Sequence, residues 1–371
     1  MKIGILTWHK AVNHGAVLQA YASQQTLKNL GCEAVILDHT RYIKRIQTPV
    51  LLKIKNIISK LSVKKLIDRE IIKAFNREKE VRFLLFQKRY LNLGYNYNSD
   101  QNLDAVLIGS DMVFEFFQGY NPYMYGKDIC APYIFSYAAS FGRTTEETMS
   151  RYKYKDEISS LLNKLDGIGY RDENTKKLIS EFAKREDLVF NIDPVLLYGF
   201  EKEIKDSEEG KWKNHRPYLV IYSYDSHMNN PQEVRNIKEF AKDNNLDIVS
   251  AGYYHSWCDE NICLDPKEFI EVIFHATYVI TDTFHGSIFS LIMKKNFASV
   301  VRKNGFKLKY LLENSGMEER IVMNNDFNSV LLKQPNYGKF DEWLKLERSN
   351  SMKYLLDQIE NAKLIKLNSI Y

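Results

Sequence analysis

Residues 281–287 are the strongest candidates for a catalytic or binding role in this chain, and they read Thr-Asp-Thr-Phe-His-Gly-Ser. It falls between a predicted buried strand at 277–281 and a predicted helix at 286–294. The N–H groups at the start of a helix attract an anion, and His285 beside them can bind a phosphate when protonated or transfer a proton. The same residues also fit a plain helix start, with an Asp or Thr side chain as the N-cap. The pattern therefore indicates either an anion site with acid–base chemistry or a capped helix.

Four basic side chains follow the next predicted strand, at 297–301. The carboxyl ends of parallel strands lie at one edge of a sheet, where ligands of doubly wound domains bind. Cations at that edge can hold a phosphate or a carboxylate, although four cations on a loop are also typical of solvated surface. The four are Arg302, Lys303, Lys307 and Lys309.

The first half of the chain has three similar corners. An arginine after the predicted strand at 166–170 can bind an anion across an interdomain cleft or pair with a neighbouring carboxylate. An aspartate after the strand at 104–108 can act as a base, accept a hydrogen bond from a sugar hydroxyl or cap a helix. An Asn-His-Gly sequence after the first strand has the same ambiguity. These candidates are Arg171, Ser110 and Asp111, and Asn13, His14 and Gly15.

Several familiar catalytic and cofactor motifs are absent from the sequence. There is no G-x-x-x-x-G-K-[ST] phosphate loop, no H-E-x-x-H zinc motif and no G-x-S-x-G nucleophile elbow. The Gly-Ile-Gly stretch at 167–169 lacks the third glycine of a dinucleotide fingerprint. Cys258 and Cys263 lie near His255, but a four-residue gap without a second ligand pair is a weak zinc pattern. We therefore expect no metal ion and no cofactor.

The elements that would position these side chains alternate between strand and helix. A strand at 2–8, a helix at 16–30 and a strand at 34–38 form the repeat of a doubly wound sheet. A polar stretch at 199–217 is typical of a linker. Before it, further strands are predicted at 104–108, 133–139, 166–170 and 188–192. After it, strands are predicted at 218–223, 247–250, 277–281 and 297–301, with helices at 231–244, 266–275 and 286–294.

This order predicts an α/β protein with two Rossmann-like, doubly wound domains that face a cleft. A chain of 371 residues is long enough for two cores. We place the N-terminal domain at 1–195 and the C-terminal domain at 196–371. A last predicted helix, at 339–365, is a candidate to pack back on the N-terminal domain.

The composition excludes several classes of protein. With 44% hydrophobic and 27% charged residues and four scattered cysteines, the chain is not typical of a disordered, collagen-like or disulfide-stapled protein. No apolar run approaches the roughly 20 residues that span a bilayer. The first residues lack the pattern of a signal peptide. We therefore expect a cytoplasmic protein.

The formal net charge of +5 is concentrated in one segment. Residues 41–82 hold 13 Lys or Arg and four Asp or Glu, a local charge of +9 that leaves −4 for the rest. Leu51, Ile54, Ile58 and Leu61 recur there at helical spacing, and a basic amphipathic helix can lie on an anionic membrane. A helix with a solvated lysine face is the alternative, and nucleic acid is disfavoured because no recognised binding module is present. The pattern alone leaves both interpretations open.

The order of these motifs resembles the polysaccharide pyruvyl transferase family. The best match is the segment at 281–286, and the resemblance extends over about residues 3–315. Each motif is short, but six in the same order are fairly specific. The others are the opening stretch at 5–22, the Gly-Ser-Asp corner at 109–111, Ser-Tyr-Ala-Ala-Ser-Phe-Gly at 136–142, Arg-Asp at 171–172 and Asp-Pro at 193–194.

The resemblance implies a GT-B-like fold and a pyruvate ketal formed on a sugar with phosphoenolpyruvate as donor. The sugar would belong to a surface polysaccharide such as a bacterial capsule or exopolysaccharide, and would be attached to a lipid carrier. With such a substrate, we expect a cytoplasmic enzyme whose segment 41–82 contacts the inner face of the cytoplasmic membrane. By this likeness the donor binds the C-terminal domain and the acceptor the N-terminal domain. The catalytic candidates are His285 and Asp111. The donor-binding candidates are Arg171, Arg302, Lys307, Thr283, Gly286 and Ser287, and the acceptor-binding candidates are Asn13, His14, Gly15 and Ser110.

Two departures from the family pattern keep other functions open. Thr283 stands where some branches carry an arginine, and Met112-Val113-Phe114 stands where Gln-Val-Trp is common. The first removes one donor contact and the second leaves the acceptor undefined. The alternatives are a GT-B glycosyltransferase that uses a nucleotide-sugar and a non-catalytic relative that binds an anion or a sugar.

Overall fold

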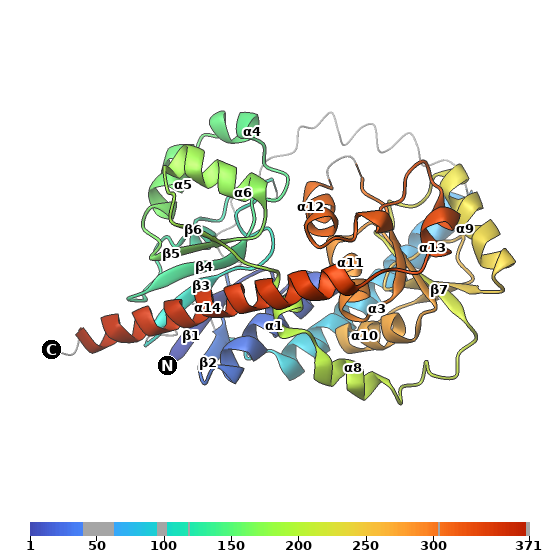
Figure 1. The fold of residues 1–371 in the computed structure, drawn as a ribbon, viewed down its shortest axis with the longest axis horizontal. Helices are drawn as coiled ribbons and strands as arrows, with labels where there is room; N and C mark the ends of the chain where they lie inside the picture. The colour runs from blue at the N-terminus through green and yellow to red at the C-terminus, as the bar shows by residue number, and fades with distance from the viewer. Residues whose placement is uncertain (40–62, 95–101, 118, 303–304, 369–371) are drawn as a thin grey trace. The chain divides into compact units, whose positions relative to one another are not determined.

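The computed structural model describes residues 1–39, 63–94, 102–117, 119–302 and 305–368, with the backbone alone for 63–67. The chain divides into two compact units, whose elements are labelled in Figure 1. Unit 1 comprises Met1–Arg45, Gln87–Phe200 and Gly338–Tyr371, and unit 2 comprises Ile46–Phe86 and Glu201–Tyr337.

Unit 1 is organised around a parallel sheet made of β1 (Lys2–Leu6), β2 (Glu33–Ile36), β3 (Ala105–Ile108), β4 (Ile134–Ala139), β5 (Gly167–Tyr170) and β6 (Leu188–Phe190). The strand order is β2-β1-β3-β4-β5-β6. Ile3 of β1 pairs with Ala34 on one side and with Ala105 on the other. The chain path therefore reverses between β1 and β3, and this is the topological switch point where doubly wound domains bind ligands.

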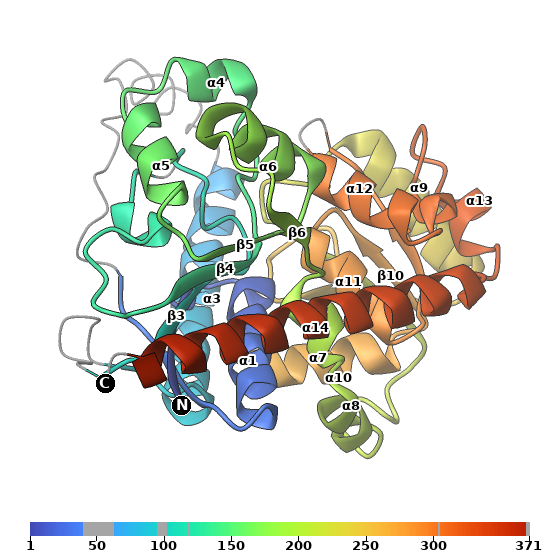
Figure 2. The same ribbon diagram turned by 60° about the vertical axis from the view of Figure 1, so that its left-hand side comes forward.

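The helices of unit 1 are α1 (His14–Asn29), η2 (Pro122–Tyr125), α4 (Glu146–Ser150), α5 (Lys155–Leu162), α6 (Glu173–Leu178), η3 (Ile179–Ala183), α7 (Pro194–Tyr198) and α14 (Gly338–Asn368). Figure 2 shows α5 and α6 on one face of the sheet and α1 and α14 on the other. The Tyr354 hydroxyl of α14 donates a 2.9 Å hydrogen bond to the Ser136 carbonyl oxygen in β4. Because helices cover both faces, the strands are nearly continuous buried apolar runs.

Unit 2 has its own parallel sheet, made of β7 (Tyr218–Tyr222), β8 (Asp247–Ala251), β9 (Glu260–Ile262), β10 (Tyr278–Thr281) and β11 (Asn296–Ser299). The strand order is β11-β10-β7-β8-β9. Tyr222 at the end of β7 pairs with Thr281 at the end of β10, and Thr281 also pairs with Ser299 of β11. The switch point of this sheet lies between β7 and β10.

The helices of unit 2 are α8 (Glu201–Ser207), α9 (Pro231–Asp243), α10 (Pro266–His275), α11 (Phe284–Ile292), α12 (Phe306–Asn314), η4 (Glu318–Arg320) and α13 (Phe327–Leu331), together with most of α3 (Val63–Tyr90). The division between the units falls inside α3, after Phe86. Buried side chains of α9, such as Ile237 and Phe240, pack with Leu219 and Ile280 of the sheet into one core. This packing fixes the strand ends of unit 2 relative to one another.

The structure confirms the predicted fold class of two doubly wound, parallel-sheet α/β units. The predicted strand at 277–281 is β10, and the predicted helices at 231–244 and 286–294 are α9 and α11. These segments were predictable because short buried runs alternate with amphipathic ones.

The two units differ from the domains predicted at 1–195 and 196–371. The last helix, α14, belongs to unit 1, and Ile46–Phe86 belongs to unit 2. The stretch at 199–217, predicted as a linker, contains α8. This helix packs against α10, where His275 Nε2 donates a 2.8 Å hydrogen bond to the Ser207 carbonyl oxygen. A short helix with mostly polar residues has too little periodicity to be distinguished from a linker.

The basic segment at 41–82 is described only in part. Residues 41–62 and the side chains of 63–67 lie outside the described residues, so the predicted membrane contact has no structural account. In the described part, Arg82 pairs with Glu268 at 3.0 Å, and Lys79 Nζ lies 3.6 Å from the centroid of the Tyr253 ring. Burial lowers the pKa of Lys79 to about 8. Within the described ranges, no helix is both long and apolar enough to cross a membrane.

Candidate functional site

The segment that the sequence singled out lies at the switch point of unit 2. β10 ends at Thr281, Asp282 follows, and α11 begins at Phe284 with Thr283 as its N-cap. The Thr283 hydroxyl accepts a 2.9 Å hydrogen bond from the Gly286 N–H. The segment is therefore a capped helix start, and it also lies at the sheet edge where an anion site was predicted.

Gly286 and Ser287 hold the first turn of α11 against the sheet. The Ser287 hydroxyl lies 2.7 Å from the Ser299 hydroxyl of β11. A Cβ atom on Gly286 would lie 2.2 Å from Thr281 Oγ1 and 2.7 Å from Tyr222 Cδ1, closer than atoms can approach. These two residues therefore permit the close approach of helix and strand.

Replacing Gly286 with alanine tests this close approach. We expect the overpacked variant to lose about 1–3 kcal/mol of unfolding free energy, because Thr281 and Tyr222 lie in the sheet and cannot move without disturbing its hydrogen bonds. Urea denaturation of wild type and variant measures the difference. An unchanged midpoint and slope would mean that α11 is free to move away from β10.

His285 is the second residue of α11, and only 7% of it is exposed. Its ring meets the Phe284 ring edge-on, with 5.4 Å between centroids. Lys307, in the first turn of α12, places Nζ 5.1 Å from the centroid of the same Phe284 ring. The structure therefore brings His285 and Lys307 together around Phe284, while Lys303 lies outside the described residues.

Arg302 is held by two buried carboxylates. Its Nε donates a 2.9 Å hydrogen bond to Asp282 Oδ2, and its Nη1 pairs with Glu233 Oε1 at 3.0 Å. Burial opposes the positive charge, but Asp282 and Glu233 outweigh it and raise the pKa of Arg302. Its Nη2 is buried and has no hydrogen-bond partner among the described residues. Arg302 thus fixes Asp282 and keeps one buried donor that no described residue satisfies.

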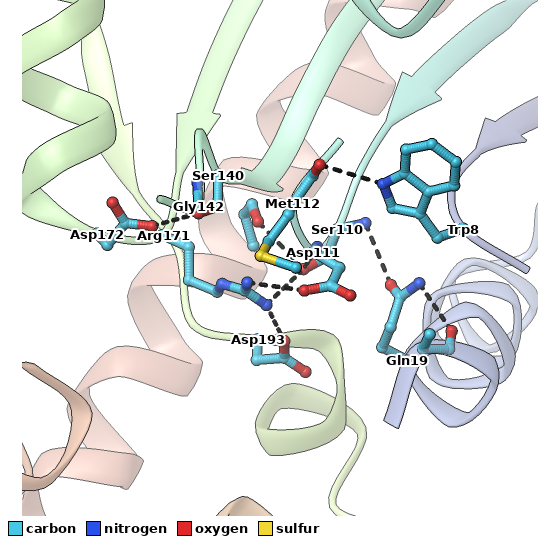
Figure 3. A network of polar contacts seen from close by, with 12 residues as sticks. Trp8, Gln19, Ser110, Asp111, Met112, Ser140, Gly142, Arg171, Asp172 and Asp193 are labelled. Atoms are coloured by element: carbon cyan, nitrogen blue, oxygen red, sulfur yellow. Dashed lines mark hydrogen bonds and ion pairs between the residues drawn. The ribbon is translucent and has the colours of Figure 1, made fainter. Parts of the chain in front are cut away.

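Arg171 lies inside unit 1, where Figure 3 shows it between two aspartates. Its Nη1 binds Asp193 Oδ2 at 2.5 Å and its Nη2 binds Asp111 Oδ1 at 3.0 Å. Only 3% of the side chain is exposed. Burial disfavours the charge, yet the carboxylates of Asp111 and Asp193 raise the pKa of Arg171. The guanidinium expected to bind the donor therefore neutralises carboxylates of its own unit, because the loops after β3 and β6 each provide one.

The neighbouring aspartate has a different role. Asp172 is the N-cap of α6 and accepts a 2.9 Å hydrogen bond from the Thr175 N–H. It also accepts a 2.6 Å hydrogen bond from the Ser140 hydroxyl. The bond between Ser140 and Asp172 lies beside the Arg171 cluster in Figure 3 and joins the ends of β4 and β5.

The Gly-Ser-Asp corner is connected to α1 at the switch point of unit 1. Gln19 accepts a 3.2 Å hydrogen bond from the Ser110 N–H (Figure 3). It also donates one of 2.6 Å to Thr7 Oγ1. Trp8 Nε1 donates a 3.1 Å bond to the Met112 carbonyl oxygen. The departure at Met112 thus leaves a backbone contact in place, because a carbonyl oxygen does not depend on the side chain.

The expected acceptor residues at the start of α1 form a helix cap. Asn13 is the N-cap and accepts a 3.0 Å hydrogen bond from the Ala16 N–H. His14 and Gly15 form the first turn and are buried. The sequence placed these residues at the correct strand end but did not reveal how deeply they are enclosed.

Three polar residues that take part in these clusters were not singled out as site residues. Asp193 holds Arg171, and His227 donates from Nδ1 to Asp282 Oδ2 at 2.8 Å. Ser223, directly after β7, is buried, and its hydroxyl has no hydrogen-bond partner among the described residues. Reading the residues at and after the end of every predicted strand, including the strand at 218–223, would have found Ser223 and His227.

The cysteines take no part in these clusters. Burial raises the pKa of the Cys258 thiol, and it raises the pKa of the Cys263 thiol to about 11. His255 is buried and lies 2.9 Å from the Ser250 hydroxyl. In the part of the chain that the structure describes, no three His, Cys, Asp or Glu side chains are grouped to hold a metal ion.

Comparison with known proteins gives a family and a fold. A family model described as polysaccharide pyruvyl transferase matches residues 13–304. No curated protein matches the sequence. Among solved structures, UDP-GlcNAc 2-epimerase from Neisseria meningitidis, bound to UDP-GlcNAc, has 9% identity and a TM-score of 0.51, covering 97% of this chain and 100% of that one. S. aureus MnaA with UDP has 11% identity and a TM-score of 0.52, covering 98% and 97%.

A third similar structure is UDP-N-acetylglucosamine 2-epimerase from Rickettsia bellii. It has 11% identity and a TM-score of 0.51, and the match covers 98% of this chain and 97% of that one. These enzymes have the GT-B fold, and the likeness confirms a GT-B-like fold for this chain. At such low identity the likeness concerns the fold alone.

Proposed function

The chain belongs to the polysaccharide pyruvyl transferase family, as the order of its motifs predicts, and on this premise we propose that it forms a pyruvate ketal on a sugar with phosphoenolpyruvate as donor. We further propose that the sugar belongs to a lipid-linked precursor of a surface polysaccharide. The family membership rests on the match over residues 13–304.

The observation that carries the donor assignment is the arrangement around the start of α11. Phosphoenolpyruvate has a phosphate and a carboxylate, so its site needs fixed cations and backbone N–H groups. The first turn of α11 lies at a switch point, His285 is in that turn, and Lys307 lies close by. Arg302 adds a buried Nη2 without a partner among the described residues. Together these groups suit a small dianionic donor.

The proposed reaction can be written with all atoms balanced. A proton added to the methylene carbon C3 makes C2 electrophilic, and a sugar hydroxyl attacks C2. Phosphate leaves from C2, and a second hydroxyl closes the ketal. Of the two hydroxyl protons, one replaces the proton spent on C3 and the other leaves with the phosphate. In this scheme His285 transfers the proton to C3, while Arg302 and Lys307 neutralise the anionic groups.

The acceptor assignment rests on unit 1. Ser110 and Asp111 lie at the switch point of its sheet, and hydroxyl and carboxylate groups there can hydrogen-bond a sugar. Asp111 is paired with Arg171, so we propose that it orients a hydroxyl as a hydrogen-bond acceptor. The lipid-linked nature of the sugar is proposed from the family alone.

One incubation separates this function from a nucleotide-sugar glycosyltransferase. Two of the similar structures have UDP-GlcNAc or UDP bound, so UDP-sugars are the donors to test for that alternative. The protein is incubated with phosphoenolpyruvate and a panel of p-nitrophenyl hexosides, and in parallel with UDP-hexoses and the same panel. We expect phosphate release in the first set together with a new ketal methyl signal in proton NMR. UDP release in the second set without phosphate release in the first contradicts the proposal.

The non-catalytic alternative gives a third pattern in the same experiment. A relative with a degraded site would bind phosphoenolpyruvate in calorimetry but release neither phosphate nor UDP. Calorimetry with phosphoenolpyruvate therefore accompanies the incubation. Binding together with turnover is the result that the proposed function requires.

A further inference from the structure

We propose that His227 is a second acid–base histidine of unit 2, which takes the proton from the attacking sugar hydroxyl, and that Asp282 orients it. This inference rests on the proposed function, because it assigns a role within the same reaction. It starts from a hydrogen bond that crosses the switch point of the sheet, 2.8 Å from His227 Nδ1 to Asp282 Oδ2.

The two residues come from neighbouring strand ends. His227 lies in the loop after β7, and Asp282 directly follows β10. β7 and β10 are adjacent and in register, with Tyr222 opposite Thr281. Since ligands of doubly wound domains bind where the chain path reverses, the hydrogen bond lies where a substrate is expected.

The two side chains differ sharply in exposure. The Asp282 carboxylate is fully buried, whereas 40% of the His227 side chain is exposed. The Tyr224 ring meets the imidazole edge-on at 5.4 Å and fixes its plane. A hydrogen bond from Nδ1 to a carboxylate places the proton of the neutral ring on Nδ1 and leaves Nε2 as the basic nitrogen. The histidine is thus held in the tautomer that a general base needs.

The orienting carboxylate is itself fixed. Asp282 Oδ2 also accepts the 2.9 Å hydrogen bond from Arg302 Nε, and Arg302 is held in turn by Glu233. The chain Glu233–Arg302–Asp282–His227 therefore prevents the carboxylate from turning away from the imidazole.

Charged and titratable groups from several elements surround the hydrogen bond between His227 and Asp282. Asp282 and Arg302 follow β10 and β11, and Glu233 lies in the first turn of α9. Tyr224 and Asp225 lie in the loop of His227 itself. From the loop after β8 comes His255, whose pKa is lowered chiefly by burial.

The proposed reaction needs one group that donates a proton and one that accepts a proton, and two histidines can fill these roles. Protonation of C3 requires a group that starts protonated, and activation of a hydroxyl requires one that starts neutral. His285 is buried in the first turn of α11, and His227 is exposed on the loop after β7, so their environments differ. Two titratable groups in different environments are the usual way to assign an acid and a base within one site.

The test replaces His227 with asparagine, whose amide N–H group can still donate to Asp282 while the basic nitrogen is lost. We expect kcat for phosphate release from phosphoenolpyruvate and the p-nitrophenyl hexosides to fall by about 100-fold or more, with little change in KM for phosphoenolpyruvate. We also expect the acidic limb of the pH–rate profile, which reports protonation of the base, to disappear. The matched control is His215→Asn. His215 also pairs with a carboxylate, since its Nε2 lies 3.4 Å from Glu260, but it lies just before β7 and therefore at the opposite edge of the sheet.

A second measurement does not depend on turnover. Comparison of the nitrogen–proton NMR spectra of the wild type and His227→Asn identifies the imidazole signals of His227, because these are absent from the variant. In the wild type, we expect these signals to show the Nδ1–H tautomer. In Asp282→Asn, we expect the preference for this tautomer to be lost. An Nε2–H tautomer in the wild type overturns the proposal.

The outcomes separate this inference from the function on which it rests. A wild type that releases no phosphate with any hexoside contradicts the proposed function and this assignment together. An active wild type with an equally active His227→Asn variant and an unchanged pH profile overturns the role of His227 alone. A His215→Asn variant as impaired as His227→Asn also overturns it, since the effect would then not depend on the switch point.

Discussion

A variant in which His285 is replaced by asparagine is expected to release phosphate from phosphoenolpyruvate about 10²- to 10⁴-fold more slowly than the wild type, the usual contribution of a positioned acid–base group. The residue lies in the first turn of α11 and is 7% exposed, so water cannot easily replace its ring. Asparagine keeps a polar side chain at this position but cannot carry the proton to C3. Phosphate release under saturating phosphoenolpyruvate measures the loss.

The control for this variant is His275→Asn. His275 is in the same unit and is partly buried, but it ends α10 just before β10, at the amino edge of the sheet. We expect this variant to keep nearly all activity, because its imidazole contacts the Ser207 carbonyl oxygen and the Phe274 ring, both away from the start of α11. If His285→Asn retained activity within a few-fold of wild type, the donor site would have to lie away from the start of α11.

The elements that hold the site were largely predictable, for a physical reason. Strands such as Tyr-Leu-Val-Ile-Tyr at 218–222 are buried on both faces, so they read as uninterrupted apolar runs. Amphipathic helices such as α9 follow them at regular intervals. The strand ends then indicate which loops share one sheet edge, and this identified the corner at 281–287.

The assignment of segments to units was less predictable. α14 packs on the sheet of unit 1 although it follows all of unit 2 in the chain, and α3 is divided between the units. The sequence made a return of the last helix to the N-terminal domain a candidate, but no local pattern encodes its contacts, because they join residues far apart in sequence. The hydrogen bond from Tyr354 to the Ser136 carbonyl oxygen joins residues more than 200 positions apart.

The partners of the charged residues could not be predicted either. The sequence showed that Arg171 and Arg302 follow strands, which is equally consistent with binding a ligand and with neutralising a carboxylate. Their actual partners, Asp193 and Glu233, lie on other elements and become neighbours only through the fold. For the same reason His227 was not predicted as a site residue, because its proposed role depends on its contact with Asp282, 55 positions away.

The second large effect is expected for Arg171→Leu, which leaves the carboxylates of Asp111 and Asp193 buried without their counter-charge. Breaking a buried ion pair from one side typically costs about 3–5 kcal/mol. For units of this size that corresponds to a fall in Tm of roughly 10 °C. Thermal unfolding followed by circular dichroism measures the shift. Arg151→Leu is the control, because Arg151 and Glu147 form an exposed pair worth at most about 1 kcal/mol.

A triple variant separates the structural role of Arg171 from a role in donor binding. Arg171→Leu combined with Asp111→Asn and Asp193→Asn removes the whole charge cluster, and neutral side chains need no counter-ion. We expect it to recover much of the lost Tm, since the cost of the single change lies in the two uncompensated carboxylates. A single Arg171→Leu variant that unfolds like the wild type but binds phosphoenolpyruvate at least tenfold more weakly in calorimetry would contradict this. Arg171 would then serve the donor, as its family likeness implies, and not the internal balance of charge in unit 1.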